Sequence, residues 1–371
     1  MAYNSLKKIL FITPFSPSAN HAGMVYTRQL LSELSNRFII DLVYFYYKGE
    51  KRFMHIDNVT VVQEVEINKK YKLLGLLSHL WVFPLFSSRY NKNVCNFLYK
   101  QVSAVKYDFV YFDFSQTFLY ASFINHPNKI LMSHDVMAQK YSRMKQYLRP
   151  WAMKTERKLL KEGVVFTFSE KDCRIIKEKY HINSIPTTFF LTKEVKEATP
   201  TIDNYFVFFG GWVREENYEA LEWYIDNVNP LIPQIKYKVI GGGLPDRIKR
   251  KLNLLKNFDY LGFVGNPYPI IAASMAEIAP LRKGAGVKVK CIDALGCGTP
   301  VIGTDIAFEG IPSEFGDFMI QAETSEEYAA AISNLNFSIE ERIKFKYNFI
   351  KKYDDKNILK YLYGECCADK L

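Results

Sequence analysis

Short apolar runs alternate along the chain with stretches that have helical spacing. The runs are rich in β-branched and aromatic residues. In the first half they are Lys8–Phe15, Phe38–Tyr46, Val59–Val65, Phe109–Phe114, Lys129–Ser133 and Val164–Phe168. In the second half they are Tyr205–Phe209, Lys236–Ile240, Phe258–Phe263, Glu277–Pro280 and Pro300–Gly303. This pattern predicts the α/β class, with two doubly wound units of parallel strands wrapped by helices.

Helical spacing is clearest at Met24–Ser35 and Ala220–Ile232. Asn217 is expected to cap the second of these helices, because an asparagine oxygen accepts hydrogen bonds from the first free backbone N–H groups. The tail Ile339–Tyr363 alternates apolar and basic residues at helical spacing, which predicts one or two closing helices.

The domain boundaries follow from a break in this pattern. Residues 184–204 contain Pro186 and Pro200 and show no clear periodicity, as is typical of a linker. We therefore expect a first domain over 1–183, a linker over 184–204 and a second domain over 205–345. A C-terminal helix over 346–371 is expected to pack back on the first domain. A length of 371 residues agrees with two hydrophobic cores.

The composition points to a cytoplasmic protein. The N-terminal lysines and apolar run imitate a signal peptide, but the run breaks at Pro14 and no small-residue cleavage pattern follows. The six cysteines show no CxxC spacing, which favours reduced thiols over disulfides or structural zinc. No stretch of about 18 uncharged apolar residues offers a membrane span.

The positive charge is concentrated in the first half. The formal charge is +10; residues 1–183 contain 27 Lys and Arg against 14 Asp and Glu (+13), and residues 184–371 contain 22 against 25 (−3). Such a basic surface attracts anionic membranes, nucleic acids or anionic substrates, and an ordinary solvated surface is also rich in lysine. No nucleic-acid recognition motif is present.

One segment of the first half, Lys69–Lys92, is apolar and aromatic between basic flanks. It is either a buried helix and loop or a surface that enters a membrane interface, with Trp81 and Phe83 at the depth of the headgroups. The second interpretation predicts peripheral binding to anionic lipid on the inner face of the cell membrane.

The stretch Ala279–Ile311 carries the clearest chemistry. A strand ends, a loop with Gly284 and Gly286 follows, and a helix is expected to begin near Val287. Glycines before a helix N-terminus let backbone N–H groups approach phosphate oxygens, and the helix dipole favours their negative charge.

Three charged residues would complete this site. Arg282 and Lys288 flank the loop as cations. Asp293 follows on the helix after the loop, where its carboxylate could accept hydrogen bonds from two ribose hydroxyl groups. The spacing therefore predicts a site for a nucleotide diphosphate.

The whole string resembles the donor-site signature of the retaining GT-B glycosyltransferases of family 4, also called glycosyl transferases group 1, which often read PLRxGxGxKxKxxEAxxxGxPVVxTxxGxEGI. The chain matches this signature at Pro280, Leu281, Arg282, Gly284, Gly286, Lys288, Lys290, Ala294, Gly298, Pro300, Val301, Thr304, Glu309, Gly310 and Ile311. Resemblance extends to FVFFGGWVREENYEALEWYIDNVNPLIP and YKVIGGGLP in the second half. In the first half, FITPFSP with Gly23 and SHDV with His134 resemble the family's acceptor-side segments.

The resemblance implies the GT-B fold, two facing Rossmann-like domains with a cleft between them and a C-terminal closing helix. It implies that the second domain binds the donor and the first domain the acceptor, with retention of anomeric configuration. His134 is then expected to be catalytic, and Gly23 to belong to the acceptor-side loop. The residues expected to bind the donor are Gly211, Arg214, Arg282, Gly284, Gly286, Val287, Lys288 and Asp293.

The chain also departs from the family pattern. Many relatives have two glutamates eight residues apart, where this chain has Ala285 and Asp293. The loop after the first strand of the second domain lacks the usual Arg and Lys, and Arg214 is expected to substitute for part of that charge. The family's Asn-Gly-Val-Asp turn is replaced by IPTTFF at Ile185–Phe190.

These observations predict a hexosyltransferase that moves a sugar from a nucleotide diphosphate donor to a glycan or lipid-linked acceptor in bacterial envelope polysaccharide or glycolipid synthesis. The sequence contains no Asp-x-Asp, so the positive loop is expected to replace a divalent metal, and no cofactor is expected besides the nucleotide sugar as co-substrate. Two alternatives stay open: an epimerase or hydrolase of nucleotide sugars on the same fold, and a basic module that binds membranes or nucleic acid.

Overall fold

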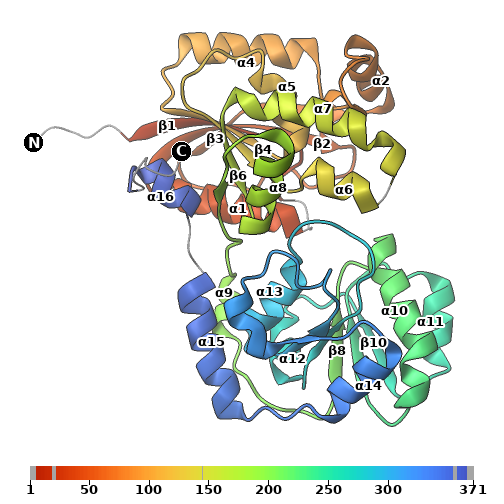
Figure 1. The fold of residues 1–371 in the computed structure, drawn as a ribbon. Helices are drawn as coiled ribbons and strands as arrows, with labels where there is room; N and C mark the ends of the chain where they lie inside the picture. Colours follow the sequence, from red (N-terminus) through yellow and green to blue (C-terminus); the bar gives the residue numbers. More distant parts are fainter. Residues whose placement is uncertain (1–5, 19–21, 144, 354–356, 366–371) are drawn as a thin grey trace, which may run out of the picture. The chain divides into compact units, whose positions relative to one another are not determined.

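The computed structural model describes residues 6–18, 22–143, 145–353 and 357–365. The chain divides into two compact units, residues 1–190 with 356–371 and residues 191–355. Each unit contains one parallel sheet with helices packed against it (Figure 1). The α/β class and the two doubly wound sheets predicted from the sequence are confirmed.

The sheet of the first unit has seven strands in the order β3-β2-β1-β4-β5-β6-β7. The strands are β1 (Lys7–Thr13), β2 (Phe38–Tyr47), β3 (Val59–Ile67), β4 (Phe109–Asp113), β5 (Lys129–Ser133), β6 (Val164–Thr167) and β7 (Ile185–Pro186). Successive residues of β1 from Ile9 to Ile12 are all buried, as expected for a parallel strand covered on both faces. The order of the strands reverses between β1 and β4.

Helices cover both faces of this sheet (Figure 1). They are α1 (Ala22–Leu34), α2 (Lys69–Ser78), α3 (Pro84–Ser87), α4 (Lys92–Ala104), α5 (Phe118–Ala121), α6 (Met137–Arg143), α7 (Arg149–Leu159), α8 (Glu170–Tyr180) and α16 (Asn357–Tyr363). Local capping defines several starts: the side chains of Asn91 and Ser169 accept hydrogen bonds from the first turns of α4 and α8.

The segment predicted as a linker is structured at both ends. β7 pairs in parallel with β6 and so extends the first sheet, while α9 (Lys193–Glu197) belongs to the second unit. The predicted C-terminal segment is also divided, because α15 (Ile339–Tyr353) lies in the second unit and α16 in the first. Within the first unit, Asn357 Nδ2 of α16 donates a hydrogen bond to the carbonyl of Pro186 at 2.9 Å.

The sheet of the second unit has six strands in the order β10-β9-β8-β11-β12-β13. The strands are β8 (Phe206–Phe209), β9 (Tyr237–Ile240), β10 (Phe258–Gly262), β11 (Glu277–Ala279), β12 (Val301–Gly303) and β13 (Met319–Gln321). The helices besides α9 and α15 are α10 (Glu215–Asn227), α11 (Asp246–Asn253), α12 (Tyr268–Ala273), α13 (Val289–Gly296) and α14 (Ser325–Ser333). The order reverses between β8 and β11.

The predicted start of α10 was wrong. The helix begins at Glu215, before Asn217, and the Asn217 side chain donates a hydrogen bond to the carbonyl of Gly211 at 2.9 Å instead of capping the helix. Glu215 and Glu216 occupy the first turn, where their charges favour the positive end of the helix dipole.

A single buried cation connects the distant segments of the second unit. The Arg342 side chain of α15 is 1% exposed and its guanidinium donates to oxygens from three other parts of the chain. Its acceptors are the carbonyls of Gly298, Thr201, Ser274 and Ala272 and the hydroxyl of Thr299, all at 2.7 to 2.9 Å. Burial lowers the Arg342 pKa to about 10, so the group stays charged at neutral pH.

We expect Arg342→Met to destabilise the second unit by about 3–5 kcal/mol, because the substitution leaves several buried carbonyl oxygens without a donor. Urea unfolding at neutral pH measures the change. Lys344→Met on the exposed side of the same helix is the matched control and should change stability by less than about 0.5 kcal/mol. Equal stability of the two variants would contradict the connecting role of Arg342.

Candidate functional site

Glycine-rich loops lie at the carboxyl edge of the sheet in the second unit. The loops that follow β8, β9, β10 and β11 are rich in glycine: Gly210, Gly211, Gly241, Gly242, Gly243, Gly265, Gly284 and Gly286. A Cβ placed on Gly241 would lie 1.8 Å from the carbonyl oxygen of Gly210, so the first two loops are in backbone contact. In open α/β sheets, ligands bind outside the carboxyl ends of the strands, where the strand order reverses. Here the reversal lies between the loops after β8 and β11.

The loop after β11 curls around a lysine. Gly284 and Gly286 have φ values of 119° and 71°, which side chains with a Cβ rarely adopt. Lys288, at the N-cap of α13, donates from Nζ to the carbonyl of Gly286 at 2.6 Å. Val287 between them packs against the core. The helix thus begins two residues later than expected, and the Lys288 ammonium lies beside its positive end.

The two arginines of the predicted site, Arg282 and Arg214, contact other groups in this structure. The Arg282 guanidinium lies 3.9 Å from the centre of the Trp223 ring and donates to the carbonyl of Glu323 at 3.0 Å. Arg214 is 72% exposed in its side chain and pairs with Glu216 at 3.6 Å. Each arginine therefore has a partner outside the glycine loop.

Asp293 is covered rather than open. Its side chain is 8% exposed, and the hydroxyl of Tyr268 donates to its Oδ2 at 3.3 Å. Burial raises the Asp293 pKa to about 7. The position expected to meet a ribose thus contacts α12 in this structure.

Glu277, which the sequence analysis did not single out, lies near Asp293. It begins β11, is completely buried, and neither carboxylate oxygen has a hydrogen-bond partner among the described residues. Burial is the main cause that raises the Glu277 pKa to about 8; Lys290 opposes the shift and the Asp293 charge adds to it. The only signal in the sequence is one carboxylate within an apolar strand.

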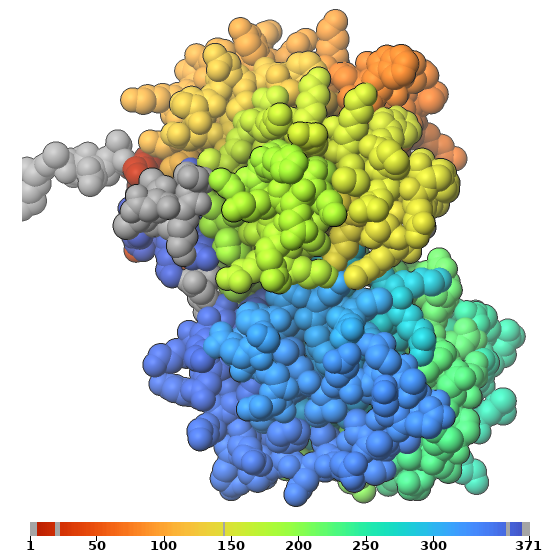
Figure 2. Space-filling view, viewed as in Figure 1, coloured from red at the N-terminus to blue at the C-terminus, as the bar shows by residue number. Residues whose placement is uncertain are grey.

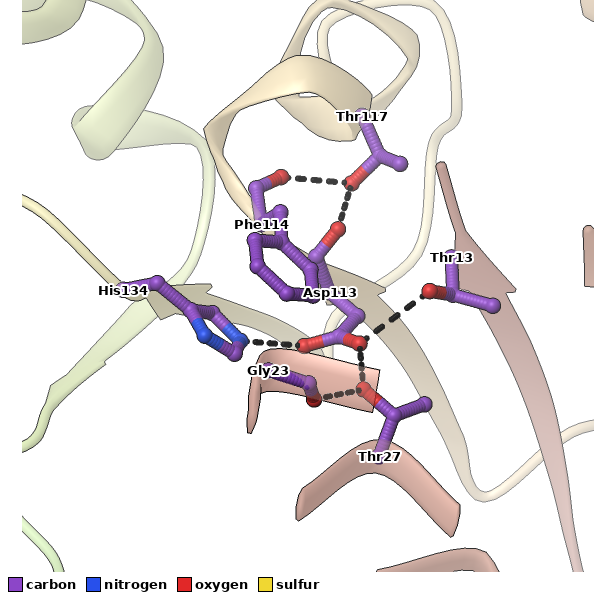
Figure 3. A network of polar contacts seen from close by, with 7 residues as sticks. All are labelled: Thr13, Gly23, Thr27, Asp113, Phe114, Thr117 and His134. Atoms are coloured by element: carbon purple, nitrogen blue, oxygen red, sulfur yellow. Dashed lines mark hydrogen bonds and ion pairs between the residues drawn. The ribbon is translucent and has the colours of Figure 1, made fainter. Parts of the chain in front are cut away.

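The first unit holds a polar network at the corresponding edge of its own sheet (Figure 3). His134 follows β5, and its Nε2 lies 2.8 Å from Oδ1 of Asp113, the buried last residue of β4. The other oxygen of Asp113 accepts hydrogen bonds from Thr27 at 2.6 Å and Thr13 at 3.2 Å. Asp113 therefore fixes the orientation of the imidazole, a role that the sequence analysis missed.

An aromatic ring and a glycine define the space around His134. The Phe114 ring stacks on the imidazole with centroids 3.4 Å apart, and Phe114 has φ of 60°, a strained value for a residue with a Cβ. A Cβ on Gly23 would lie 2.6 Å from the Phe114 ring and 3.7 Å from Nδ1 of His134. Gly23 thus leaves room beside Nδ1, which has no hydrogen-bond partner among the described residues.

The described part of the chain contains no group of three or more His, Cys, Asp and Glu side chains that could hold a metal ion. None of its helices combines the length and the apolar character needed to cross a bilayer.

The comparisons with known proteins bear first on the second unit. The family model of the glycosyl transferases group 1 matches residues 203–336. The matched residues lie within the second unit and span the whole glycine-rich edge, from Gly210 to Lys288. A protein of the cps (capsule) region of Klebsiella pneumoniae is 26% identical over 175 residues, which is 43% of this chain and 45% of that protein.

Solved structures extend the likeness beyond the matched residues to nearly the whole chain. Sucrose-phosphate synthase of Thermosynechococcus elongatus aligns with a TM-score of 0.69 and 15% identity, over 97% of this chain and 98% of that one. HepE of Anabaena, solved with UDP and glucose, aligns with a TM-score of 0.67 and 14% identity, over 97% and 98% of the two chains. At these identities the matches show the fold, and they confirm the expected GT-B architecture of two Rossmann-like units.

The buried Glu277 predicts how stability depends on pH. Because folding raises its pKa from 4.5 to about 8, the folded protein binds more protons than the unfolded chain between these values. The free energy of unfolding should therefore fall as the pH rises from 5 to 8, by about 1 kcal/mol per pH unit from this group. Glu277→Gln should lessen the decline, whereas Glu340→Gln, at an exposed position, should not. Unfolding in urea at pH 5 and pH 8 tests this, and identical pH dependence of the Glu277→Gln variant and the wild type would contradict it.

Proposed function

We propose that this protein is a glycosyltransferase that moves a hexosyl group from a nucleotide diphosphate donor to an acceptor hydroxyl. One observation carries the proposal: the group 1 match covers the glycine-lined edge where the strand order reverses, including the loop around Lys288. The UDP in the HepE structure, and the UDP-2-fluoroglucose in a structurally similar trehalose-6-phosphate protein of E. coli, support a nucleotide sugar as the donor.

The donor diphosphate is proposed to lie at Gly284–Lys288. Backbone N–H groups at the start of α13 would donate to its oxygens, and the Lys288 ammonium would exchange the Gly286 carbonyl for a phosphate. Arg282 and Arg214 would contribute charge by leaving their present partners, which side chains at exposed positions can do at little cost. Gly211 and Val287 would line the site through their backbone, and a contact of Asp293 with the ribose would need the Tyr268 hydroxyl to give up its hydrogen bond.

In the reaction the bond between the anomeric carbon and the diphosphate oxygen breaks, and a bond from that carbon to the acceptor oxygen forms. The acceptor hydroxyl gives up its proton, which the oxygen of the leaving diphosphate can take up. Negative charge grows on the leaving phosphate, where Lys288 and the α13 N-terminus stabilise it. Retention of configuration and independence of divalent metal are part of the proposal.

His134 is proposed as the catalytic residue of the first unit. Asp113 accepts from Nε2, which leaves Nδ1 directed to the space that Gly23 keeps open. This arrangement lets Nδ1 contact a hydroxyl of the bound sugar or of the acceptor, as in other histidines held by a carboxylate. The likeness to a protein of a capsule region supports a glycan or lipid-linked acceptor in envelope polysaccharide synthesis.

A thermal-shift screen of nucleotides and nucleotide sugars tests the proposed donor. A ligand that binds only the folded state at 100 times its Kd adds about 2.7 kcal/mol of stability. Nucleoside diphosphates and their sugars should raise the melting temperature, and the matching nucleosides should have little effect. If no nucleotide sugar shifts the melting temperature, the proposed function is wrong.

Lys288→Ala should lower kcat/KM for transfer by roughly two to three orders of magnitude, because a contact of this type is worth about 3 kcal/mol in the transition state. Lys283→Ala is the matched control in the same loop: that lysine pairs with Glu219 at 2.7 Å, and its loss should change kcat/KM less than about twofold. Steady-state kinetics with the donor found in the screen measures both. A folded Lys288→Ala variant with wild-type kcat/KM would show that the diphosphate lies elsewhere.

Transfer activity is expected to persist in EDTA, because the lysine and the helix N-terminus provide the positive charge that a bridging metal would otherwise supply. The rate is measured before and after chelation, and again after Mg²⁺ or Mn²⁺ is added back. Loss of most of the activity in EDTA, restored by either ion, would contradict metal-independent transfer.

A further inference from the structure

Helix α2 exposes a row of large apolar side chains. Leu73, Leu74, Leu77 and Leu80 are between 54% and 63% exposed, and Trp81 is 94% exposed. Spacings of three and four residues place the leucines of α2 on one face of the helix, and Leu80 and Trp81 follow directly. We call these five residues the α2 patch. Figure 2 shows this segment, in orange, at the surface of the first unit.

The opposite face of α2 is firmly packed, so the patch is not the result of a loose helix. A Cβ on Gly75 would lie 2.4 Å from the carbonyl oxygen of Ser87, which means that the helix backbone touches the chain beneath it. The buried Tyr71 donates its hydroxyl to the carbonyl of Arg89 at 2.8 Å. Trp151 donates its indole N–H to the backbone carbonyl of Trp81 at 3.0 Å, which anchors the end of the patch.

The segment that contains the α2 patch carries one sign of charge. Residues 67–107, which contain α2, α3 and α4, include seven Lys and Arg residues and no Asp or Glu. Lys69 and Lys70 are exposed at the start of α2, one turn before Leu73 and Leu74. Lysines beside exposed leucines and a tryptophan are the combination found where a helix lies in the interface of an anionic bilayer.

We propose that the α2 patch docks on an anionic lipid bilayer, with the leucines and Trp81 among the headgroups and acyl chains and the lysines on lipid phosphates. A second copy of the chain fits less well, because a symmetric contact would bring two identical groups of lysines together. The proposal is independent of the transfer reaction.

The position of α2 gives the docking a consequence. The helix leaves the sheet at the carboxyl end of β3, the same edge at which the His134 network lies. Lys72 of α2 lies 4.8 Å from the centre of the Tyr47 ring at the end of β2. A bilayer at the α2 patch would therefore adjoin the edge proposed for the acceptor, which suits an acceptor carried on a lipid.

Co-sedimentation of the full chain with vesicles tests the docking. The protein should bind mixed phosphatidylglycerol and phosphatidylcholine vesicles, bind pure phosphatidylcholine weakly, and lose affinity as salt rises. Lys69→Gln with Lys70→Gln should lower the partition coefficient about fivefold per lysine, and Leu77→Ser with Trp81→Ser roughly tenfold or more. The matched controls in the second unit, Lys236→Gln with Lys256→Gln and Leu231→Ser with Leu254→Ser, should bind as the wild type does.

Tryptophan fluorescence separates insertion from adhesion. Emission should shift to the blue when anionic vesicles are added, and Trp81→Phe should abolish most of the shift, since Trp81 is the indole most exposed to water. Vesicle binding that is equal in the patch variants and their controls would overturn the proposal. So would patch variants that turn a dimer into a monomer in analytical ultracentrifugation while vesicle binding stays unchanged, because the patch would then be covered by a second copy.

Discussion

In a parallel sheet all strands end at the same edge, and neighbouring loops separate only where the strand order reverses. Both units obey this constraint, with reversals between β1 and β4 and between β8 and β11. The two candidate sites lie at these reversals. At the second, the loops after β8 and β11 contain glycines, which have no side chain to keep a ligand away from the backbone N–H groups. At the first, the strand ends supply Thr13 and Asp113, and His134 follows the next strand.

The two units satisfy buried charge in opposite ways. In the first, one carboxylate is neutralised by donors, since Asp113 accepts from two hydroxyls and from His134. In the second, one cation is held entirely by oxygens of the backbone and of Thr299, so Arg342 needs no carboxylate. Glu277 is buried without a hydrogen-bond donor among the described residues, and its pKa is raised as a result. Its burial close to Asp293 places a titratable carboxyl group near the proposed donor site.

The sequence was sufficient for features with strong local signals. Apolar runs identified the central strands of both sheets, and the glycines at 284 and 286 marked a loop whose φ values require them. The edge strands β7 and β13 were missed, since neither forms an apolar run: Pro186 is one of the two residues of β7, and β13 ends in the exposed Gln321.

Side-chain directions were beyond the reach of the sequence. Arg282 is predicted to meet the diphosphate, and in this structure its guanidinium stacks on Trp223, 59 positions earlier in the chain. Asp113 is one of several polar residues that end an apolar strand, so the sequence did not single it out. Its contact with His134 is visible only in the folded structure. The sequence alone did not show whether the leucines of α2 are buried or exposed. The close contact of Gly75 with Ser87 decides which side of the helix faces outward.

The central claim is that the donor diphosphate binds where the loop after β11 meets the start of α13. A crystal structure of the protein grown with UDP, or with the nucleoside diphosphate that stabilises it best, tests this claim most directly. The account predicts diphosphate oxygens within hydrogen-bonding distance of backbone N–H groups at Gly286–Val289 and of Lys288 Nζ. A diphosphate bound at the carboxyl edge of the first sheet, or bound to neither edge, would contradict it.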